Sequence, residues 1–302
     1  MLIIGVDPGN RFTKATSEHN EIIFSSTVGS GRNIIFKMND NKSKSLITIN
    51  GNKYFVGSMA TRESYDASLA LDETRVEHEN TVVLILTAVA RVLKCNALWA
   101  NVDLITGMPI IYYKEHKLRQ RLTDKLRKQN YNIEFQGQKR VINFQSVTVF
   151  PEGAAALFSV IREEFKTNRI GIIDVGSWRS NYCVLDEMEY EDKSSGTLPL
   201  GMHQALLMLD TNKLLHEIED MPQQNKELKE QIEKARKAKA RQIADAIRGK
   251  WTSADFFALY LAGGGAGYLK EFFPNAHIIS DPQMANARGL YKVGRMYADN
   301  TV

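Results

Sequence analysis

Short, continuous apolar runs along this chain alternate with longer stretches of helical periodicity. The runs are too short for helices and end at glycine, proline or polar residues, so they predict buried strands: Leu2–Val6, Val102–Ile105, Ile170–Val175 and Tyr260–Ala262. Returning strands are predicted at 11–16 and 182–185, and a hairpin around Asn50-Gly51. Helices are predicted over Thr81–Leu93, Leu118–Leu126, Pro151–Glu164 and Gln223–Lys250. Buried strands interleaved with helices indicate the α/β class.

The bulk composition narrows the class of protein. Of the 302 residues, 43% are hydrophobic and 25% are charged, as in ordinary globular proteins, and the length suggests two domains. The formal net charge is only +4, which is not the profile of a dedicated nucleic-acid binder. The basic stretches 114–128 and 226–250 also contain acidic residues, so we interpret them as solvated helix faces and expect no direct contact with nucleic acid.

The cysteines and the N-terminus bear on where the protein acts. Cys95 and Cys183 are far apart and have no metal-site spacing, which favours a reducing, cytoplasmic compartment. A buried strand begins at Leu2 with no basic region or cleavage site before it, so we expect no signal peptide. The longest apolar run, Val82–Ala90, is too short for a membrane span.

One internal repeat stands out from the pattern. Ile4–Asn10 resembles Gly171–Ser177, because both consist of an apolar strand, an aspartate, one further residue, a glycine and a small polar residue. Each copy is followed by a second strand-like run. Asp7 and Asp174 are separated by about half of the chain, which predicts two related α/β halves.

The chemistry of these two loops points to phosphate. A tight turn after a buried strand can direct successive backbone N–H groups at an anion, and glycine allows the anion to approach closely. Asp7 and Asp174 stand where they can hold the hydrated Mg²⁺ that accompanies phosphates. The alternative for a single loop is a plain connection in which Gly9 or Gly176 supplies a positive φ.

Three further features are candidates for the same site. Lys14 can serve as a phosphate counter-charge, or it is an exposed strand lysine. Glu152, after Pro151, can orient or deprotonate a water molecule, or it complements a helix dipole. Gly263–Gly265 can let a ring or ribose lie against the backbone, or it is a flexible connection; it does not have the spacing of a dinucleotide-binding loop.

Taken in order, five segments resemble the signature of the actin-like ATPases, and in particular of the ParM/StbA group that segregates plasmids. They resemble the first phosphate loop, the first connecting helix, the second phosphate loop, the adenosine loop and the second connecting segment, at 7–14, 150–156, 174–177, 261–266 and 281–290. Ile105-Thr106-Gly107-Met108-Pro109 is also similar to a Thr-Gly-Leu-Pro segment of that group.

The resemblance implies an actin-like (ribonuclease-H-like) duplicated fold, with two domains around a nucleotide cleft. Domain I would span 1–160, with a small strand-rich subdomain at about 22–65, and would be rejoined by a C-terminal helix at 286–302; domain II would span 167–285. Asp7 and Asp174 would be catalytic and hold Mg²⁺, and Glu152 would be catalytic by handling the water. The implied contacts to ATP or GTP are Gly9, Asn10, Arg11, Lys14, Gly176, Ser177, Trp178, Gly263, Gly264 and Gly265.

The implied function is that of a filament-forming ATPase or GTPase. It would polymerise with itself when nucleotide is bound and would move plasmid DNA through a ParR-like adaptor on a centromere, in the cytoplasm and away from membranes. A small-molecule kinase of the same superfamily is an alternative, although the chain is short for a sugar kinase. A non-hydrolysing scaffold is another, because Asn181 replaces an aspartate that many relatives have after the second phosphate loop.

Overall fold

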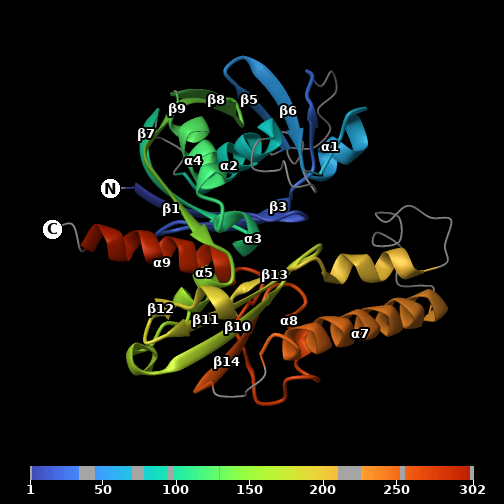
Figure 1. Ribbon diagram of the computed structural model, residues 1–302. Coiled ribbons are helices and arrows are strands. Elements are labelled where there is room, and N and C mark those ends of the chain that lie inside the picture. Colours follow the sequence, from blue (N-terminus) through green and yellow to red (C-terminus); the bar gives the residue numbers. More distant parts are fainter. Residues whose placement is uncertain are drawn as a thin grey trace. The chain divides into compact units, whose positions relative to one another are not determined.

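The computed structural model describes residues 2–33, 45–69, 78–93, 98–128, 130–209, 226–251 and 256–299. The chain forms two compact units (Figure 1). Unit 1 consists of Met1–Ser159 and Asn286–Val302, and unit 2 consists of Val160–Ala285. Each unit is built on one β-sheet with helices packed against it, which confirms the predicted α/β class. None of the helices in these described ranges is both long and apolar enough to cross a bilayer.

The sheet of unit 1 has the strand order β3-β2-β1-β7-β9-β8-β5-β6-β4. Its strands are β1 (Leu2–Pro8), β2 (Phe12–Thr16), β3 (Glu21–Ser25), β4 (Val28–Ser30), β5 (Leu46–Ile49), β6 (Asn52–Val56), β7 (Trp99–Met108), β8 (Tyr131–Phe135) and β9 (Gln138–Pro151). β1 runs antiparallel to β2 and parallel to β7. The predicted hairpin is confirmed at β5–β6, where Asn50 and Gly51 both have positive φ, as a tight two-residue turn requires.

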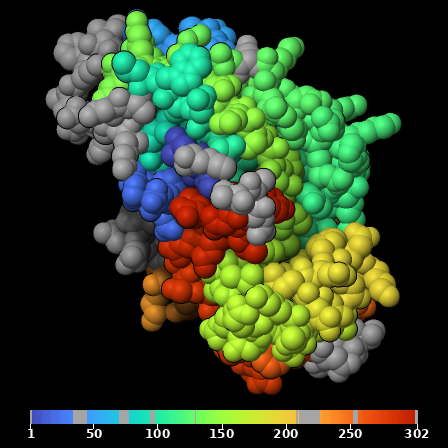
Figure 2. Space-filling model, turned by 90° about the vertical axis from the view of Figure 1, so that its left-hand side faces the viewer, coloured from blue at the N-terminus to red at the C-terminus, as the bar shows by residue number. Residues whose placement is uncertain are grey.

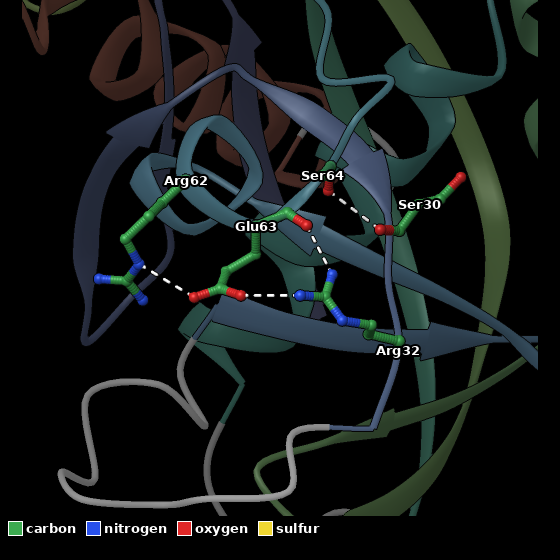
Figure 3. Close-up of polar contacts among 5 residues, drawn as sticks. All are labelled: Ser30, Arg32, Arg62, Glu63 and Ser64. Atoms are coloured by element: carbon green, nitrogen blue, oxygen red, sulfur yellow. Dashed lines mark hydrogen bonds and ion pairs between the residues drawn. The ribbon is translucent and has the colours of Figure 1, made fainter.

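The helices of unit 1 are α1 (Ser58–Glu63), α2 (Glu79–Val92), α3 (Ile110–Tyr113), α4 (His116–Arg127), α5 (Ala154–Phe158) and α9 (Ala285–Asp299). α2 is buried nearly all round and lies in the main core with α4, as its apolar sequence predicts. At the outer strands, Arg32 donates to both the carbonyl and the carboxylate of Glu63 (Figure 3). Ser64 Oγ donates to the carbonyl of Ser30, so polar contacts hold α1 and the residues around it against the end of β4.

The sheet of unit 2 has the order β12-β11-β10-β14-β15, with β13 paired to β11. Its strands are β10 (Arg169–Val175), β11 (Ser180–Asp186), β12 (Glu189–Tyr190), β13 (Gly196–Leu198), β14 (Ala258–Ala262) and β15 (His277–Ile278). Its helices are α7 (Lys226–Arg248), α8 (Ala266–Leu269) and the 3-10 segments η3 (Glu163–Thr167), η4 (Asp192–Ser194) and η5 (Met202–Met208). α7 buries Ile243 and Ile247 and exposes a charged face with ion pairs three residues apart.

The internal repeat in the sequence is a structural repeat. In unit 1, β1 pairs antiparallel with β2 and parallel with β7; in unit 2, β10 pairs antiparallel with β11 and parallel with β14. The register is also the same, because Asp7 lies opposite Lys14 and Asp174 lies opposite Asn181. The two Asp-x-Gly loops therefore connect equivalent strands of equivalent sheets.

One predicted helix is wrong in its extent. The stretch 151–164 was expected to be helical from Pro151, but Pro151 is the last residue of β9 and pairs with Met108 of β7. The N–H of Glu152 continues this ladder by donating to the carbonyl of Met108. α5 starts only after Gly153, whose φ of 82° breaks the strand, and it ends at Phe158. Sheet pairing has overridden the preference of proline for the first turn of a helix.

Several sequence features lie partly or wholly outside the described residues. They are Cys95, the first three residues of the predicted helix 223–250, residues 34–44 of the predicted subdomain and residues 300–302 of the predicted C-terminal helix. Cys183 lies in β11 with a free, buried thiol, and burial raises its pKa to about 12. A thiol with such a pKa is almost entirely protonated at neutral pH, so it behaves as a small core residue.

Glycines allow α9 to pack backbone to backbone within unit 1. A Cβ at Gly289 would collide with the carbonyl of Ala155 in α5, and a Cβ at Gly5 would lie 2.6 Å from the carbonyl oxygen of Ala287. Around these contacts Ile3, Ile105, Ala155, Leu290 and Val293 form a small buried cluster. Figure 2 shows α9 in red beside the blue N-terminal strands of the same unit. α9 is therefore fixed to β1 and α5 with little freedom to shift.

This packing predicts a selective effect of adding one methyl group. Gly289→Ala is expected to lower the free energy of unfolding by about 1–3 kcal/mol, because the methyl group meets a rigid carbonyl. Gly267→Ala in α8 is the matched control: its Cβ meets open space, and alanine favours a helix by about 1 kcal/mol. Urea unfolding followed by circular dichroism measures both. Equal stability of the two variants would contradict the packing account.

Candidate functional site

The first loop places a buried ion pair at the end of β1. The carboxylate of Asp7 is only 4% exposed, and Lys14 Nζ donates to its Oδ2 at 3.0 Å. The Lys14 side chain is 13% exposed, so it is not an exposed strand lysine. The hairpin register produces the contact because it sets these two residues opposite each other. Lys14 thus brings a positive charge to the loop, where a phosphate would need one.

Two hydrogen bonds from Ser26 hold the turn between β1 and β2. Ser26 Oγ donates to the carbonyl of Gly9 at 2.6 Å, and the Ser26 N–H donates to the carbonyl of Arg11 at 2.8 Å. A Cβ at Gly9 would lie 2.5 Å from the carbonyl of Phe12 and 2.8 Å from Lys14 Nζ, so glycine keeps the turn tight around the lysine. Asn10 and Arg11 are half-buried in the same turn.

Glu152 lies beside Asp7 in unit 1. Glu152 is 9% exposed, and its Cγ lies 3.3 Å from where a Cβ would stand on Gly107. The Oδ1 of Asp7 lies 3.8 Å from the same point. α5 begins two residues after Glu152, which therefore lies just before the helix N-terminus and not in its first turn. Sequence reasoning found both carboxylates but assigned no role to Gly107, which leaves the space between them open.

The carbonyl groups of the second loop are engaged by residues 202–204. Its three carbonyls, at Gly176, Ser177 and Trp178, accept hydrogen bonds from the N–H of Met202, the N–H of His203 and the side-chain amide of Gln204. The Trp178 ring also packs against His203, with the ring centroids 5.2 Å apart. Within the described part of the chain, the N–H groups of Ser177 and Trp178 donate to no residue. Carbonyls held on one side and N–H donors left available are what a phosphate cradle requires.

The three predicted glycines after β14 differ in their surroundings. A Cβ at Gly263, where φ is 81°, would lie 2.6 Å from Asp174 Oδ1. A Cβ at Gly265 would lie 2.5 Å from a side-chain carbon of Met202 and would also clash with Val175. Gly264 has no heavy atom within 4 Å of its Cβ position. Gly263 and Gly265 therefore pack inward on the Asp174 loop, and Gly264 is the glycine open to a ligand.

The acidic groups suit a metal that comes with its own ligands. Asp174 is 5% exposed and lies opposite Asn181, whose Oδ1 accepts from Thr197 Oγ1 at 2.7 Å. No cluster of three or more potential metal-ligating side chains occurs among the residues that the structure describes. Mg²⁺ usually binds through one or two carboxylates, waters and substrate phosphates. Single aspartates at the ends of β1 and β10 fit that mode of binding and not a closed protein cage.

The predicted site residues thus fall into two groups. Unit 1 brings together Asp7, Gly9, Asn10, Arg11, Lys14 and Glu152. Unit 2 brings together Asp174, Gly176, Ser177, Trp178, Gly263, Gly264 and Gly265. A residue that sequence reasoning gave no role is Asn286, whose Oδ1 accepts the N–H of Gly153, next to Glu152. Gly153 and Asn286 are too far apart in the sequence for any local pattern to link them.

Comparison with known proteins finds relatives in sequence and in fold. Residues 5–154 match the family model described as the N-terminal domain of actin-like proteins. A non-polymerisable quadruple mutant of pCBH ParM is 27% identical, with a TM-score of 0.79 over 98% of this chain and 99% of that one. A 15-stranded ParM filament from Clostridium botulinum is 26% identical, with a TM-score of 0.82 over 98% and 99%.

A more distant structure shares the fold. An archaeal actin homologue in complex with ADP is 19% identical, with a TM-score of 0.78 over 98% of this chain and 100% of that one. No curated protein matches the sequence.

The buried ion pair of the first loop predicts a stability effect. Lys14→Met is expected to destabilise unit 1 by about 3–5 kcal/mol, because it leaves the Asp7 carboxylate buried without its partner. Lys166→Met, which breaks an exposed pair with Glu163, is the control and should change stability little. Thermal and urea unfolding measure both. If Lys14→Met is no worse than Lys166→Met, the Asp7–Lys14 contact does not organise this loop.

Proposed function

We propose that this chain, which is an actin-like protein of the ParM type, is a filament-forming nucleoside triphosphatase that segregates plasmid DNA. It would bind ATP or GTP with Mg²⁺, assemble with itself in the cytoplasm, and reach DNA through a ParR-like adaptor on a centromere. The observation that carries the proposal is the repeated Asp-x-Gly hairpin loop, present in both units with the same register. Units 1 and 2 would be the two domains of the actin-like fold.

Phosphate binding is supported by the groups that each loop offers. In unit 1, Lys14 provides a positive charge within a tight turn at Gly9. In unit 2, the N–H groups of Ser177 and Trp178 provide donors on a backbone whose carbonyls are already used. Gly264 has the open surface that a ribose or base would need. One solved relative of the same fold is a complex with ADP.

Hydrolysis is assigned to Glu152, with Asp7 and Asp174 organising the metal and water. When bound, Mg²⁺ would neutralise part of the charge on the phosphates, and the two aspartates would hold its hydration shell. Glu152 is mostly buried, and its side chain and the Asp7 carboxylate both approach Gly107, so Glu152 can hold a water molecule and accept its proton. One observation supports the alternative of a non-hydrolysing scaffold. Asn181, which lies opposite Asp174, is uncharged and accepts a hydrogen bond from Thr197.

Self-assembly is the first test. An interface between different faces of two copies that does not close makes an open filament, and solved relatives include a ParM filament. Addition of ATP or GTP with Mg²⁺ should raise light scattering, and negative-stain images should show filaments; the same samples with EDTA or without nucleotide are the controls. Monomers in every nucleotide condition and at every concentration would refute the filament proposal.

Glu152 separates assembly from hydrolysis. Glu152→Ala leaves both phosphate loops intact, so the variant should still assemble with nucleotide. Loss of general-base help should slow phosphate release by about 10²–10⁴-fold, and its filaments should persist. Paired light scattering and phosphate release measure both properties in one sample, with Glu163→Ala, an exposed glutamate, as the control. Phosphate release at the wild-type rate by Glu152→Ala would remove Glu152 from the catalytic role.

A further inference from the structure

The backbone on both sides of the Glu152 side chain is held by hydrogen bonds. The N–H of Glu152 donates to the carbonyl of Met108 at 2.9 Å. The N–H of the next residue, Gly153, donates to Asn286 Oδ1 at 3.0 Å in the interior of unit 1. The first bond is an extension of the β7–β9 ladder, whereas the second comes from α9. Asn286 is only 6% exposed.

Gly153 has no side chain that restricts its backbone torsion angles, so its conformation depends on contacts with other residues. Its φ is 82°, and glycine populates positive φ values about as readily as negative ones because it has no Cβ. The peptide unit after Glu152 therefore depends on neighbouring groups for its orientation. The acceptor from Asn286 fixes that peptide unit, and with it the direction in which the Glu152 side chain leaves the backbone.

α9 supplies a rigid platform for this acceptor. Gly289 lies against the backbone of Ala155, and Arg288 makes two hydrogen bonds to the Glu21 carboxylate, at 2.8 and 2.7 Å. Leu290, one turn after Asn286, is fully buried and lies 3.5 Å from where a Cβ would stand on Gly107. The same stretch of α9 thus contacts both the turn after Glu152 and the glycine that the Glu152 side chain approaches. Removing the Asn286 side chain alone leaves this platform in place.

We propose that Asn286 is a positioning residue for the hydrolysis assigned to Glu152. It acts through the peptide unit of Gly153, holding the Glu152 side chain against Gly107, which Asp7 also approaches, without touching the nucleotide itself. The proposal rests on the proposed hydrolytic function. What is new is that Asn286 determines whether the Glu152 carboxylate is correctly positioned. Asn286 is also the first residue of unit 1 after the chain returns from unit 2. The residue that holds the Gly153 N–H therefore lies where the chain re-enters unit 1.

The test compares variants of nearly equal shape. Asn286→Leu fills the same space but lacks the acceptor, whereas Asn286→Asp keeps an oxygen for the Gly153 N–H. Asn286→Leu should lower kcat by about 10²-fold with KM nearly unchanged, because a displaced catalytic group slows the chemistry and not the binding. Asn286→Asp should recover most of that loss. Lys292→Met, which removes a contact from α9 to the Ser159 carbonyl, is the control on the same helix and should keep wild-type kcat.

A double variant shows whether Asn286 acts through Glu152. If it does, Asn286→Leu has no further effect on phosphate release in a Glu152→Gln background. An equal loss in both backgrounds, unchanged kcat in Asn286→Leu, or a change in KM alone would overturn the proposal. Thermal unfolding confirms that each variant is folded, and Asn286→Ala replaces Asn286→Leu if the latter is not. A wild-type protein that releases no phosphate would instead refute the proposed hydrolysis itself.

Discussion

Asp7 and Asp174 each carry a carboxylate into the interior at the end of a central strand, and a buried charge is costly unless neighbouring groups compensate for it. Much of the surrounding structure provides groups that compensate for these two carboxylates. In unit 1 the hairpin register sets Lys14 opposite Asp7, and the two form an ion pair. In unit 2 the equivalent position is the neutral Asn181. The two loops therefore share a geometry but differ at this register position, where the first hairpin has a lysine and the second has a neutral amide.

Keeping these carboxylates buried and still reachable requires backbone without side chains around them. Gly107 leaves room for Glu152 beside Asp7, and Gly263 leaves room for Asp174. In both units this glycine belongs to, or directly follows, the strand that runs parallel to the aspartate's own strand. The close approach of α9, made possible by Gly289 and Gly5, then presents Asn286 to the turn after Glu152. The site is thus a consequence of tight packing as much as of the residues that would carry the chemistry.

Periodicity and turn chemistry were sufficient to predict the central strands, the β5–β6 hairpin, the duplicated loops and the α/β class, whereas the actin-like fold was implied by the resemblance of five segments to the actin-like ATPases. They failed at Pro151, because a proline after an apolar run is read as the start of a helix, whereas pairing with β7 extends β9 through it. They also gave no role to Gly107 or Asn286. Both act through contacts between residues distant in sequence, such as Gly153 with Asn286, and only the folded chain brings such residues together.

The central claim is that both Asp-x-Gly loops hold the phosphates of one nucleotide. The most direct measurement is a crystal structure of the protein with Mg²⁺ and a non-hydrolysable ATP or GTP analogue. The account predicts phosphate oxygens within hydrogen-bonding distance of Lys14 Nζ and of the N–H groups of Ser177 and Trp178, with the ribose or base near Gly264. A nucleotide bound elsewhere, or phosphates that contact neither loop, would contradict it.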